Sequence, residues 1–359
     1  MNNKINSDAQ VTVSTDSIDE ETAKQLALFT ESIADGNTLV GYDIRPRFVH
    51  TRRSKVTSLV EYGEKGDKII QLKDGTVYSI SPAVIDRDGK KLAIFPGTRE
   101  SLVEEAIMSF ASSRQFDPNV REPGYKYDSS GLKVIFTLYQ LWSHMCKHSK
   151  TYNYAELHEA LLVLKQAGHY KGKLHDFGDG KLRKADAYSS YITGLVFVDH
   201  ESPDISNVKV DKFISVRLNE EATTLILDGK YKLYDDHMSM KMHSPIARFL
   251  YKKIIQQVRY APEDEVRDPI KLKQNECILV SGYQIQNNAT KRKAAFLAAL
   301  KELVRLKVLC PIDESLIETV KEGRAIVEMI FTVDIHEQMF EYLHKVYERD
   351  LRQLELSKS

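Results

Sequence analysis

The feature that most constrains this fold is the helical period of the apolar side chains between residues 291 and 307. On a helical wheel of about 100° per residue, one sector is entirely apolar. That sector contains Phe296, Leu297, Leu300, Leu303 and Val304. The opposite sector is small and basic, with Lys291, Ala294, Ala295, Ala298, Lys301 and Arg305, and with Arg292 and Lys293 in the first turn. The pattern predicts a helix with one core face and one basic outer face.

The basic outer face is compatible with two interpretations. A small, basic helical face fits a DNA groove, with its alanines at base edges and its cations at phosphates. The same residues are also typical of an ordinary surface helix built from good helix formers. The periodicity alone does not decide between the two.

Charge is informative here only through its distribution, because 51 basic and 51 acidic residues cancel. Acidic residues outnumber basic ones in residues 1–40 and again in residues 308–359. Positive charge gathers in 291–307 and in 240–260, which lacks acids and contains Lys241, Arg248, Lys252, Lys253 and Arg259. A local concentration of this kind is what a nucleic-acid-binding surface requires.

Cysteine usage and hydropathy indicate the cellular setting. The three cysteines, Cys146, Cys277 and Cys310, are odd in number and far apart, so the sequence predicts neither a disulfide framework nor a paired metal motif. No apolar run approaches the ~18 residues that cross a bilayer, and the polar start resembles no signal peptide. We therefore expect a soluble, cytoplasmic protein.

The first 124 residues divide into an acidic, partly disordered stretch (1–40) and a β-rich region with one helix (41–124). Asp74-Gly75 and Asp88-Gly89 separate short apolar runs in residues 68–96, which predicts hairpins in a small meander. Before them, the segment 43–55 has five cations, and no acid lies between the first of these, Arg45, and the last, Lys55. Such a run is compatible with a DNA-contacting arm, although it is more commonly a solvated basic loop. The role of this N-terminal region is not readable from the sequence.

The middle of the chain predicts two helices and a hairpin. Apolar side chains recur every three or four residues in 129–148 and again in 152–167, which indicates two amphipathic helices. Residues 169–198 follow with turn chemistry at Gly178-Asp179-Gly180 and predict a basic wing. Its cations are Lys171, Lys173, Lys181, Arg183 and Lys184.

A further helix begins at Ser244-Pro245, a capping residue followed by proline at the first helical position. Its periodicity turns apolar side chains inward, and it places Arg248 and Lys252 on the outer face. Residues 335–356 close the chain as a charged helix. The order helix, helix, hairpin therefore occurs twice, and an offset of 139 aligns residues 155–164 with 294–303.

Three stretches carry a resemblance to a known family, the plasmid and secondary-chromosome replication initiators (Rep proteins) of bacteria. They are YNYAELHEALLVLKQAG, VRLNEEATTLILDGKYKLYDDHMSMKMHSPIARFLYKKI and KRKAAFLAALKELVRLKVL, within residues 125–335. The resemblance implies two tandem winged-helix domains and a recognition helix that enters the major groove of a directly repeated origin sequence, the iteron. It implies DNA contacts by Lys291, Arg292 and Lys293, and phosphate contacts by Arg248 and Lys252.

The same resemblance implies the partners and their roles. They are double-stranded origin DNA, the host replication initiator and the replicative helicase, with origin opening, helicase loading and repression of the protein's own gene. It also implies a homodimer or a monomer–dimer equilibrium. The chain departs from the family in its N-terminal region of about 120 residues and in the short turn before Tyr152.

Motifs of nucleotide-driven or nuclease chemistry are absent from the sequence. There is no GxxxxGK[ST] phosphate loop, since residues 168–173 have the wrong spacing and no Ser or Thr. No two histidines flank a single apolar residue, as a rolling-circle nuclease needs. We therefore expect no enzymatic activity, no cofactor and no metal site.

The sequence thus predicts an α+β chain in which two tandem winged-helix domains follow a small hairpin-containing N-terminal region. The expected domains are 125–235 and 236–359, the second with its C-terminal helix. The expected DNA contacts are Lys291, Arg292, Lys293, Lys301, Arg305, Arg248, Lys252, Lys171, Lys173, Lys181, Arg183 and Lys184. Two alternatives to an initiator stay open: a winged-helix transcriptional regulator that binds an inverted repeat in a promoter, and a structural or partition adaptor.

Overall fold

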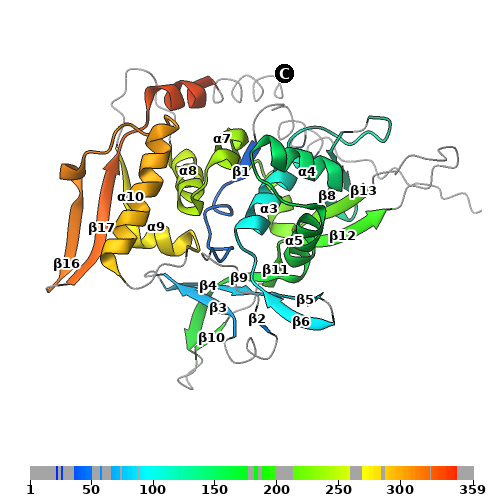
Figure 1. The fold of residues 1–359 in the computed structure, drawn as a ribbon, viewed down its shortest axis with the longest axis horizontal. Helices are drawn as coiled ribbons and strands as arrows, with labels where there is room; N and C mark the ends of the chain where they lie inside the picture. Colours follow the sequence, from blue (N-terminus) through cyan, green and yellow to red (C-terminus); the bar gives the residue numbers. More distant parts are fainter. Residues whose placement is uncertain are drawn as a thin grey trace, which may run out of the picture.

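The computed structural model describes most of the chain between residues 36 and 345. The described ranges are 36–50, 57–58, 66–72, 75–87, 89–120, 122–176, 182–184, 188–198, 213–258, 269–283, 288–323 and 325–345, with positions 22 and 26. The fold is α+β, as the sequence predicts, with two groups of helices and several small sheets, some of which lie along one side of both groups (Figure 1).

One helical cluster, the first unit, is built from α3 (Thr98–Ala111), α4 (Leu138–Lys147) and α5 (Tyr154–Gln166). Its sheet has the strand order β12-β13-β8-β7. These strands are β7 (Gly124–Asp128), β8 (Gly131–Thr137), β12 (Ile192–Val198) and β13 (Phe213–Leu218). The hairpin β12–β13 follows the helix pair, and β13 also pairs with β8, which precedes α4.

The expected continuous helix over 129–148 is wrong in its first half. Residues 131–137 form strand β8, in which Leu132, Val134 and Phe136 are buried and the alternate residues are half-buried. Burial in this segment therefore alternates with the period of two of a strand, and not with the three-and-four spacing of a helix. Thr137 then caps the start of α4 with a capping box. The Thr137 hydroxyl accepts from the Gln140 N–H at 3.1 Å, and the Thr137 N–H donates to Gln140 Oε1 at 2.6 Å.

The second unit repeats this plan with α8 (Pro245–Gln257), α9 (Gln274–Val280) and α10 (Ala289–Arg305). Its strands are β15 (Ile270–Lys273), β16 (Glu318–Glu322) and β17 (Ala325–Val333), in the order β15-β17-β16. In both units the strand before the helix pair joins the last strand of the hairpin. This topology is the winged-helix arrangement, which confirms the predicted fold.

A short connection joins the two units. It comprises α6 (Glu220–Leu227), β14 (Tyr231–Tyr234) and α7 (Asp236–Lys241). Asn219 caps α6, its side chain accepting from Ala222 N–H at 2.7 Å, and Ser244 caps α8 at 3.3 Å. The start of α8 is the one that Ser244-Pro245 predicts.

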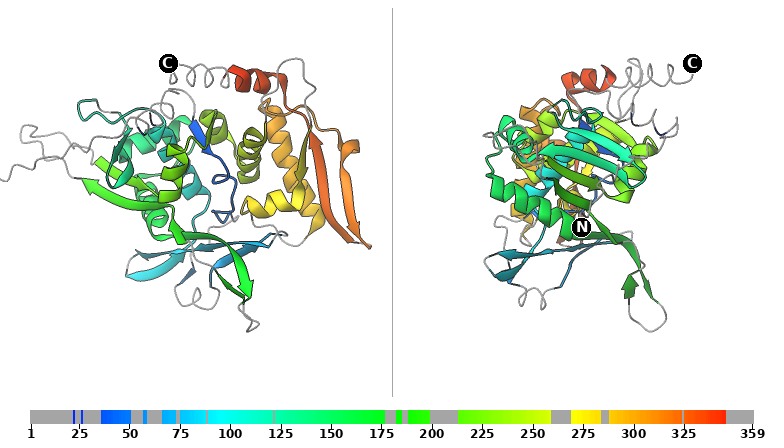
Figure 2. Two further views of the ribbon diagram at one scale, coloured as in Figure 1. Left: turned by 180° about the vertical axis from the view of Figure 1, so that it is seen from behind. Right: turned by 90° about the vertical axis from the view of Figure 1, so that its right-hand side faces the viewer.

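The N-terminal region is interleaved with both units. Strand β1 (Gly36–Leu39) pairs with β14 of the connection. Residues 40–50, the crossing segment, then run to the end of α9, where His50 N–H donates to Gly282 C=O at 2.9 Å. The strands that follow lie along one side of both units, as the views in Figures 1 and 2 agree. The region therefore ties the two units together.

The expected meander in residues 68–96 is instead two hairpins in two sheets. Strands β3 (Lys68–Gln71) and β4 (Thr76–Ser81) pair with each other, as do β5 (Ala83–Arg87) and β6 (Lys90–Ile94), as the Asp-Gly signals predict. Pro82 separates β4 from β5, and it has no N–H with which to continue a ladder. The short strand β2 (Thr57–Ser58) adds to β6.

The expected basic wing over 169–198 is also wrong. Strand β9 (Gly168–Asp176) pairs with β4, and β10 (Leu182–Lys184) and β11 (Tyr188–Ser190) pair with β9 in that same sheet. The wing of the first unit is β12–β13. Strands β9 and β10, on either side of residues 178–180, pair as a hairpin. No local signal in the sequence shows that β9 also pairs with an N-terminal strand.

Each unit has its own hydrophobic core. The first core contains Leu157, Leu161 and Leu164 of α5 and also draws on α3, which lies before residue 125. The second contains Phe296, Leu300 and Leu303 of α10 with Phe331 of β17. The domain boundaries at 40, 124 and 235 stay predictions.

A helix over residues 337–345 covers one end of the second unit, where Met339 is buried (Figure 1). No helix in the described ranges has the length and apolar character that crossing a membrane requires.

Candidate nucleic-acid interface

Helix α10 has the two faces that its sequence predicts. Phe296, Ala299, Leu300 and Leu303 are buried. Leu297 and Val304, which the wheel also placed inward, are half-buried against the same core. Because the core face is fixed by packing, the opposite face is held outward.

The outward face of α10 is small and basic, as expected. Its exposed side chains are those of Lys291, Ala294, Ala298, Lys301 and Arg305. Ala295, which the wheel placed with them, is half-buried against the second core. Alanines on this face let the helix backbone approach a partner closely, while the flanking cations extend past them.

The first turn of α10 carries three consecutive cations and no acid. Asn288 caps it by accepting from Lys291 N–H at 3.1 Å. Cations at a helix N-terminus oppose the helix dipole at a cost of about 0.3–1 kcal/mol each, so they do not serve helix stability. A helix N-terminus with cations in its first turn attracts anions such as phosphate.

The two other cations of this turn are less exposed than Lys291. Lys293 is half-buried, with its Nζ 3.8 Å from Glu314 Oε2. Arg292 lines a small hollow with Gln274, Asn275 and Met329, and its buried Nε has no hydrogen-bond partner among the described residues. An arginine held in this way has unused donors beside the helix start.

The equivalent helix of the first unit, α5, has a matching core face. At the offset of 139, Leu157, Ala160, Leu161 and Leu164 match Phe296, Ala299, Leu300 and Leu303, and all eight are buried. Ala155 and Ala294 are both exposed. The sequence repeat is therefore a structural repeat of the helix that follows the turn. The helix before α5 is α4, and the helix before α10 is α9, so the repeated helix pair is α4–α5 and α9–α10. The expected order, which counted the helix that begins at Ser244-Pro245 as the first of the second pair, is corrected in this respect.

The outward face of α5 differs from that of α10. It exposes Tyr154 and His158, and its first turn holds Glu156 in place of cations. Glu159 pairs with Arg99 of α3 at 2.9 Å. Strand β5 of the N-terminal region packs against α5 as well. The basic face is thus a property of the second unit.

The wing of the second unit is acidic. Glu318 and Glu322 are exposed on β16, and Glu314 is exposed just before it. Glu318 pairs with Lys271 at 2.9 Å, with both side chains more than half exposed. Like charge repels phosphate, so the positive surface of this unit is α10 and not its wing.

Arg248 and Lys252 do not lie on an outer face, which corrects the expectation for α8. Arg248 is only 5% exposed, and the Lys252 Nζ lies 3.4 Å from Glu105 Oε2 of α3. The sequence could not show that α3 packs against this side of α8, so both cations looked solvated. They lie between the units and are not available to DNA in this arrangement.

The expected cations of the 169–198 hairpin are partly described. Lys171 is exposed on β9. Lys173 lies on β9, and Arg183 and Lys184 lie on β10. Lys181 lies outside the described residues. Their part in DNA binding stays a prediction.

The arginine run at 45–53 is not a free arm where the structure describes it. Arg47 is 4% exposed and donates to Glu104 at 2.6 Å and to Asp43 at 3.0 Å. Arg45 donates to Glu221 at 2.5 Å. The signal that sequence reasoning missed is in α3, where Glu104 and Glu105 interrupt an otherwise apolar run and need cationic partners. Arg52 and Arg53 lie outside the described residues.

Comparisons with known proteins give similarity of fold only. No family model matches the sequence, and no curated protein matches it. A crystal structure of domains 2 and 3 of RctB has a TM-score of 0.44 and 10% identity, covering 87% of this chain and 98% of that chain. A second RctB structure of the same domains has a TM-score of 0.42 and 10% identity, covering 84% and 98%.

The Pi initiator protein, solved in complex with iteron DNA, has a TM-score of 0.38 and 12% identity, covering 67% of this chain and 91% of that chain. With TM-scores below 0.5, these likenesses carry no part of the functional argument. That argument rests on the residues of α10.

Proposed function

We propose that this chain is a sequence-specific double-stranded DNA-binding protein that initiates replication at a plasmid-type origin by binding direct repeats. The observation that carries the DNA-binding proposal is α10, whose outward face is small and basic and whose first turn holds Lys291, Arg292 and Lys293 without an acid. The replication role rests on the sequence resemblance to Rep proteins. Origin opening, helicase loading with the host initiator, and repression of the protein's own gene belong to that role.

The chemistry of binding follows from the two kinds of side chain on α10. The cations neutralise phosphates and release condensed counterions, which supplies affinity and makes it depend on salt. Ala294 and Ala298 allow the helix to lie close to base edges, where the cations beside them can read guanine and the methyl groups can contact thymine. Binding of several protomers to direct repeats would bend the DNA beside them.

The asymmetry of the two units adds a specific expectation. Because the first turn of α5 holds Glu156 and no cation, whereas that of α10 holds three cations and no acid, we propose that α10 supplies most of the phosphate and base contacts in each protomer. A single protomer then recognises one non-palindromic DNA site, and protomers bound to direct repeats of that site lie head to tail along the DNA.

The test compares the double variant Lys291→Ala/Arg292→Ala with the matched control Lys126→Ala/Lys147→Ala. The control removes the same charge from exposed positions on β7 and α4. The bound sequence is first selected from random duplexes with the wild-type chain, and affinities are then measured by fluorescence anisotropy over a salt series. We expect the α10 variant to lose roughly tenfold or more in affinity and to lower the salt slope by about two, at ~0.9 per phosphate contact.

The control should keep both the affinity and the slope of the wild type. Equal affinity of the α10 variant and the wild type would refute the assignment of α10. The replication role is tested separately, by asking whether the gene and its flanking DNA let a non-replicating circle persist. Failure of that test with specific binding intact would favour a transcriptional regulator.

A further inference from the structure

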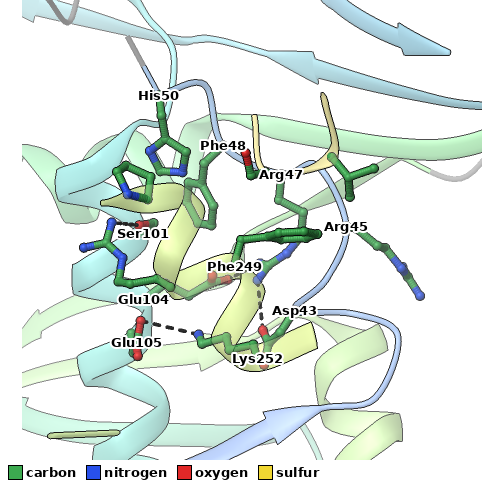
Figure 3. A pocket seen from close by; sticks show the side chains of 14 residues that line it. Asp43, Arg45, Arg47, Phe48, His50, Ser101, Glu104, Glu105, Phe249 and Lys252 are labelled. Carbon is green, nitrogen blue, oxygen red and sulfur yellow. Dashed lines mark hydrogen bonds and ion pairs between the residues drawn. The ribbon is translucent and has the colours of Figure 1, made fainter. Parts of the chain in front are cut away.

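A cavity lies where the two units and the crossing segment meet. Figure 3 shows its lining, in which Arg47 and His50 belong to the crossing segment, Ser101 to α3 and Phe249 to α8. Its volume is about 60 Å³. A cavity that holds one water needs only roughly 10–15 Å³, so this one has room for a small polyatomic ligand such as a tetrahedral oxyanion.

The carboxylates that line the cavity are already engaged. Asp43 and Glu104 both accept from Arg47, at 3.0 and 2.6 Å. Glu105 accepts from the Tyr234 hydroxyl at 2.9 Å and lies 3.4 Å from the Lys252 Nζ. These contacts engage Arg47 and Lys252, and none of them joins a lining carboxylate to Arg248.

Arg248 is a lining cation that makes no hydrogen bond to a lining carboxylate among the described residues. It is 5% exposed, and its hydrogen bond among the described residues is a long one, from Nη2 to Ser101 Oγ at 3.5 Å. Glu302 also acts on its charge, but the oxygens of that carboxylate accept from the N–H groups of His243 and Ser244. A guanidinium has five donors, so most of those on Arg248 have no acceptor in the described chain.

The electrostatics of the cavity agree with this accounting. Burial lowers the pKa of Arg248, although Glu105 and other nearby acids oppose the shift. Burial and the nearby Arg248 charge lower the pKa of His50 to about 3, so its imidazole is neutral. A buried, under-partnered cation is costly, and an acceptor supplied from solution would remove that cost.

We propose that this cavity is a binding site for a compact oxyanion of the phosphate class, held by the Arg248 guanidinium and by the Ser101 hydroxyl, which turns to the anion from the Thr98 carbonyl oxygen to which it now donates. The planar fork of an arginine matches two oxygens of such an anion. The anion would touch α3 of the first unit, α8 of the second and the crossing segment between them. Its binding fixes how the two units sit against each other, and it does not depend on the DNA-binding proposal.

The size of the cavity selects the source of the phosphate group. It holds a free oxyanion but not a nucleoside, so orthophosphate should bind while AMP and duplex DNA should not compete for the site. The experiment is isothermal titration of the full chain with orthophosphate in chloride buffer at constant ionic strength, with AMP and a short duplex as competitors. Thermal melting in the same solutions reports the stabilisation.

Three variants make the result specific. Arg248→Met removes the buried charge but keeps an unbranched side chain, and we expect it to weaken binding by roughly tenfold or more. Ser101→Ala removes one acceptor and donor from an intermediate position and should weaken binding less, which keeps the test decisive if Arg248→Met does not fold. Arg114→Met removes a surface cation, paired with Glu122 on a half-exposed loop, and should bind as the wild type does.

Lys291→Ala/Arg292→Ala separates the two sites, because any orthophosphate binding that it loses belongs to the start of α10 and the binding that remains belongs to the cavity. The proposal is overturned if the wild type shows no saturable binding at any orthophosphate concentration that leaves it folded. It is equally overturned if Arg248→Met and Ser101→Ala both bind with wild-type affinity, or if AMP and DNA displace orthophosphate.

Discussion

Replacing Arg47 by Met should destabilise the first unit strongly, because it leaves two buried carboxylates without their cation. Arg47 is 4% exposed, and the side chains of its partners Asp43 and Glu104 are 8% and 12% exposed. Its guanidinium also lies 4.0 Å from the centre of the Tyr42 ring. Removing one partner of a buried pair costs about 3–5 kcal/mol, and two stranded acids place this variant near the upper end.

The assay is urea unfolding followed by tryptophan fluorescence, since the sequence has one tryptophan, Trp142, and it packs against the first core. The matched control is Arg114→Met, whose ion pair with Glu122 is 34% and 60% exposed and should contribute less than about 1 kcal/mol. A loss below about 1 kcal/mol for Arg47→Met, equal to that of the control, would refute the reasoning.

The cost of Arg47→Met should also grow with pH. Burial raises the pKa of Glu104, and Arg47 opposes that shift. A carboxyl with a raised folded pKa favours the fold below its unfolded pKa, and this advantage is lost as pH rises through the folded pKa. Without Arg47 the folded pKa of Glu104 rises further, so the difference from wild type should be larger at neutral pH than near pH 4. A difference that shrinks as pH rises would contradict this account.

Further predictions concern the cores and the crossing segment. Leu161→Ala and Leu300→Ala remove buried side chains at equivalent positions of α5 and α10, and each should cost about 2–5 kcal/mol in urea unfolding. Gly282→Ala should detach the crossing segment from the end of α9, because Gly282 has a φ of +71° and an added Cβ would lie 1.8 Å from the Phe48 carbonyl oxygen. Limited proteolysis near residue 50 should then be faster than in the wild type. Thr137→Ala should cost about 1 kcal/mol by removing the cap of α4, measured by thermal unfolding.

Local signals predicted most of the helices and hairpins of this chain. The helical period of 291–307, the Ser244-Pro245 start and the two Asp-Gly turns each depend on residues within one turn or one hairpin, and each appears in the structure. The repeat at an offset of 139 was predictable for the same reason, since both copies bury the same positions. Together these signals specified the winged-helix class.

Pairings between distant segments were not predictable from the sequence. Residues 131–137 fit a helix and a strand by spacing, and it is pairing with β13, about 80 residues later, that makes them β8. Strand β9 carries lysines at its start, as a wing would, but it pairs with β4 of the N-terminal region. Neither choice is encoded within the segment itself.

The candidate DNA-contacting residues show the same difference between local signals and distant packing. The outward face of α10 was predictable because it follows from the core face of the same helix. Arg248 and Lys252 were misplaced because their position depends on α3, which lies about 150 residues earlier. The periodicity of apolar residues in the sequence shows on which face of its own helix a side chain lies. Whether that face is exposed to solvent depends on the other elements that pack against it.

The crossing segment explains why the charge pattern misled in the middle of the chain. Lys252 of α8 and Arg47 of the crossing segment face the acids of α3, and Arg45 faces Glu221 of α6, so acid-free runs in the sequence are not acid-free in space. The first turn of α10 differs, because Lys291 is exposed and the acid near Lys293 belongs to the same unit. Positive charge that the fold leaves outward, at a helix start where it opposes the dipole, is the part of this pattern that indicates a partner outside the chain.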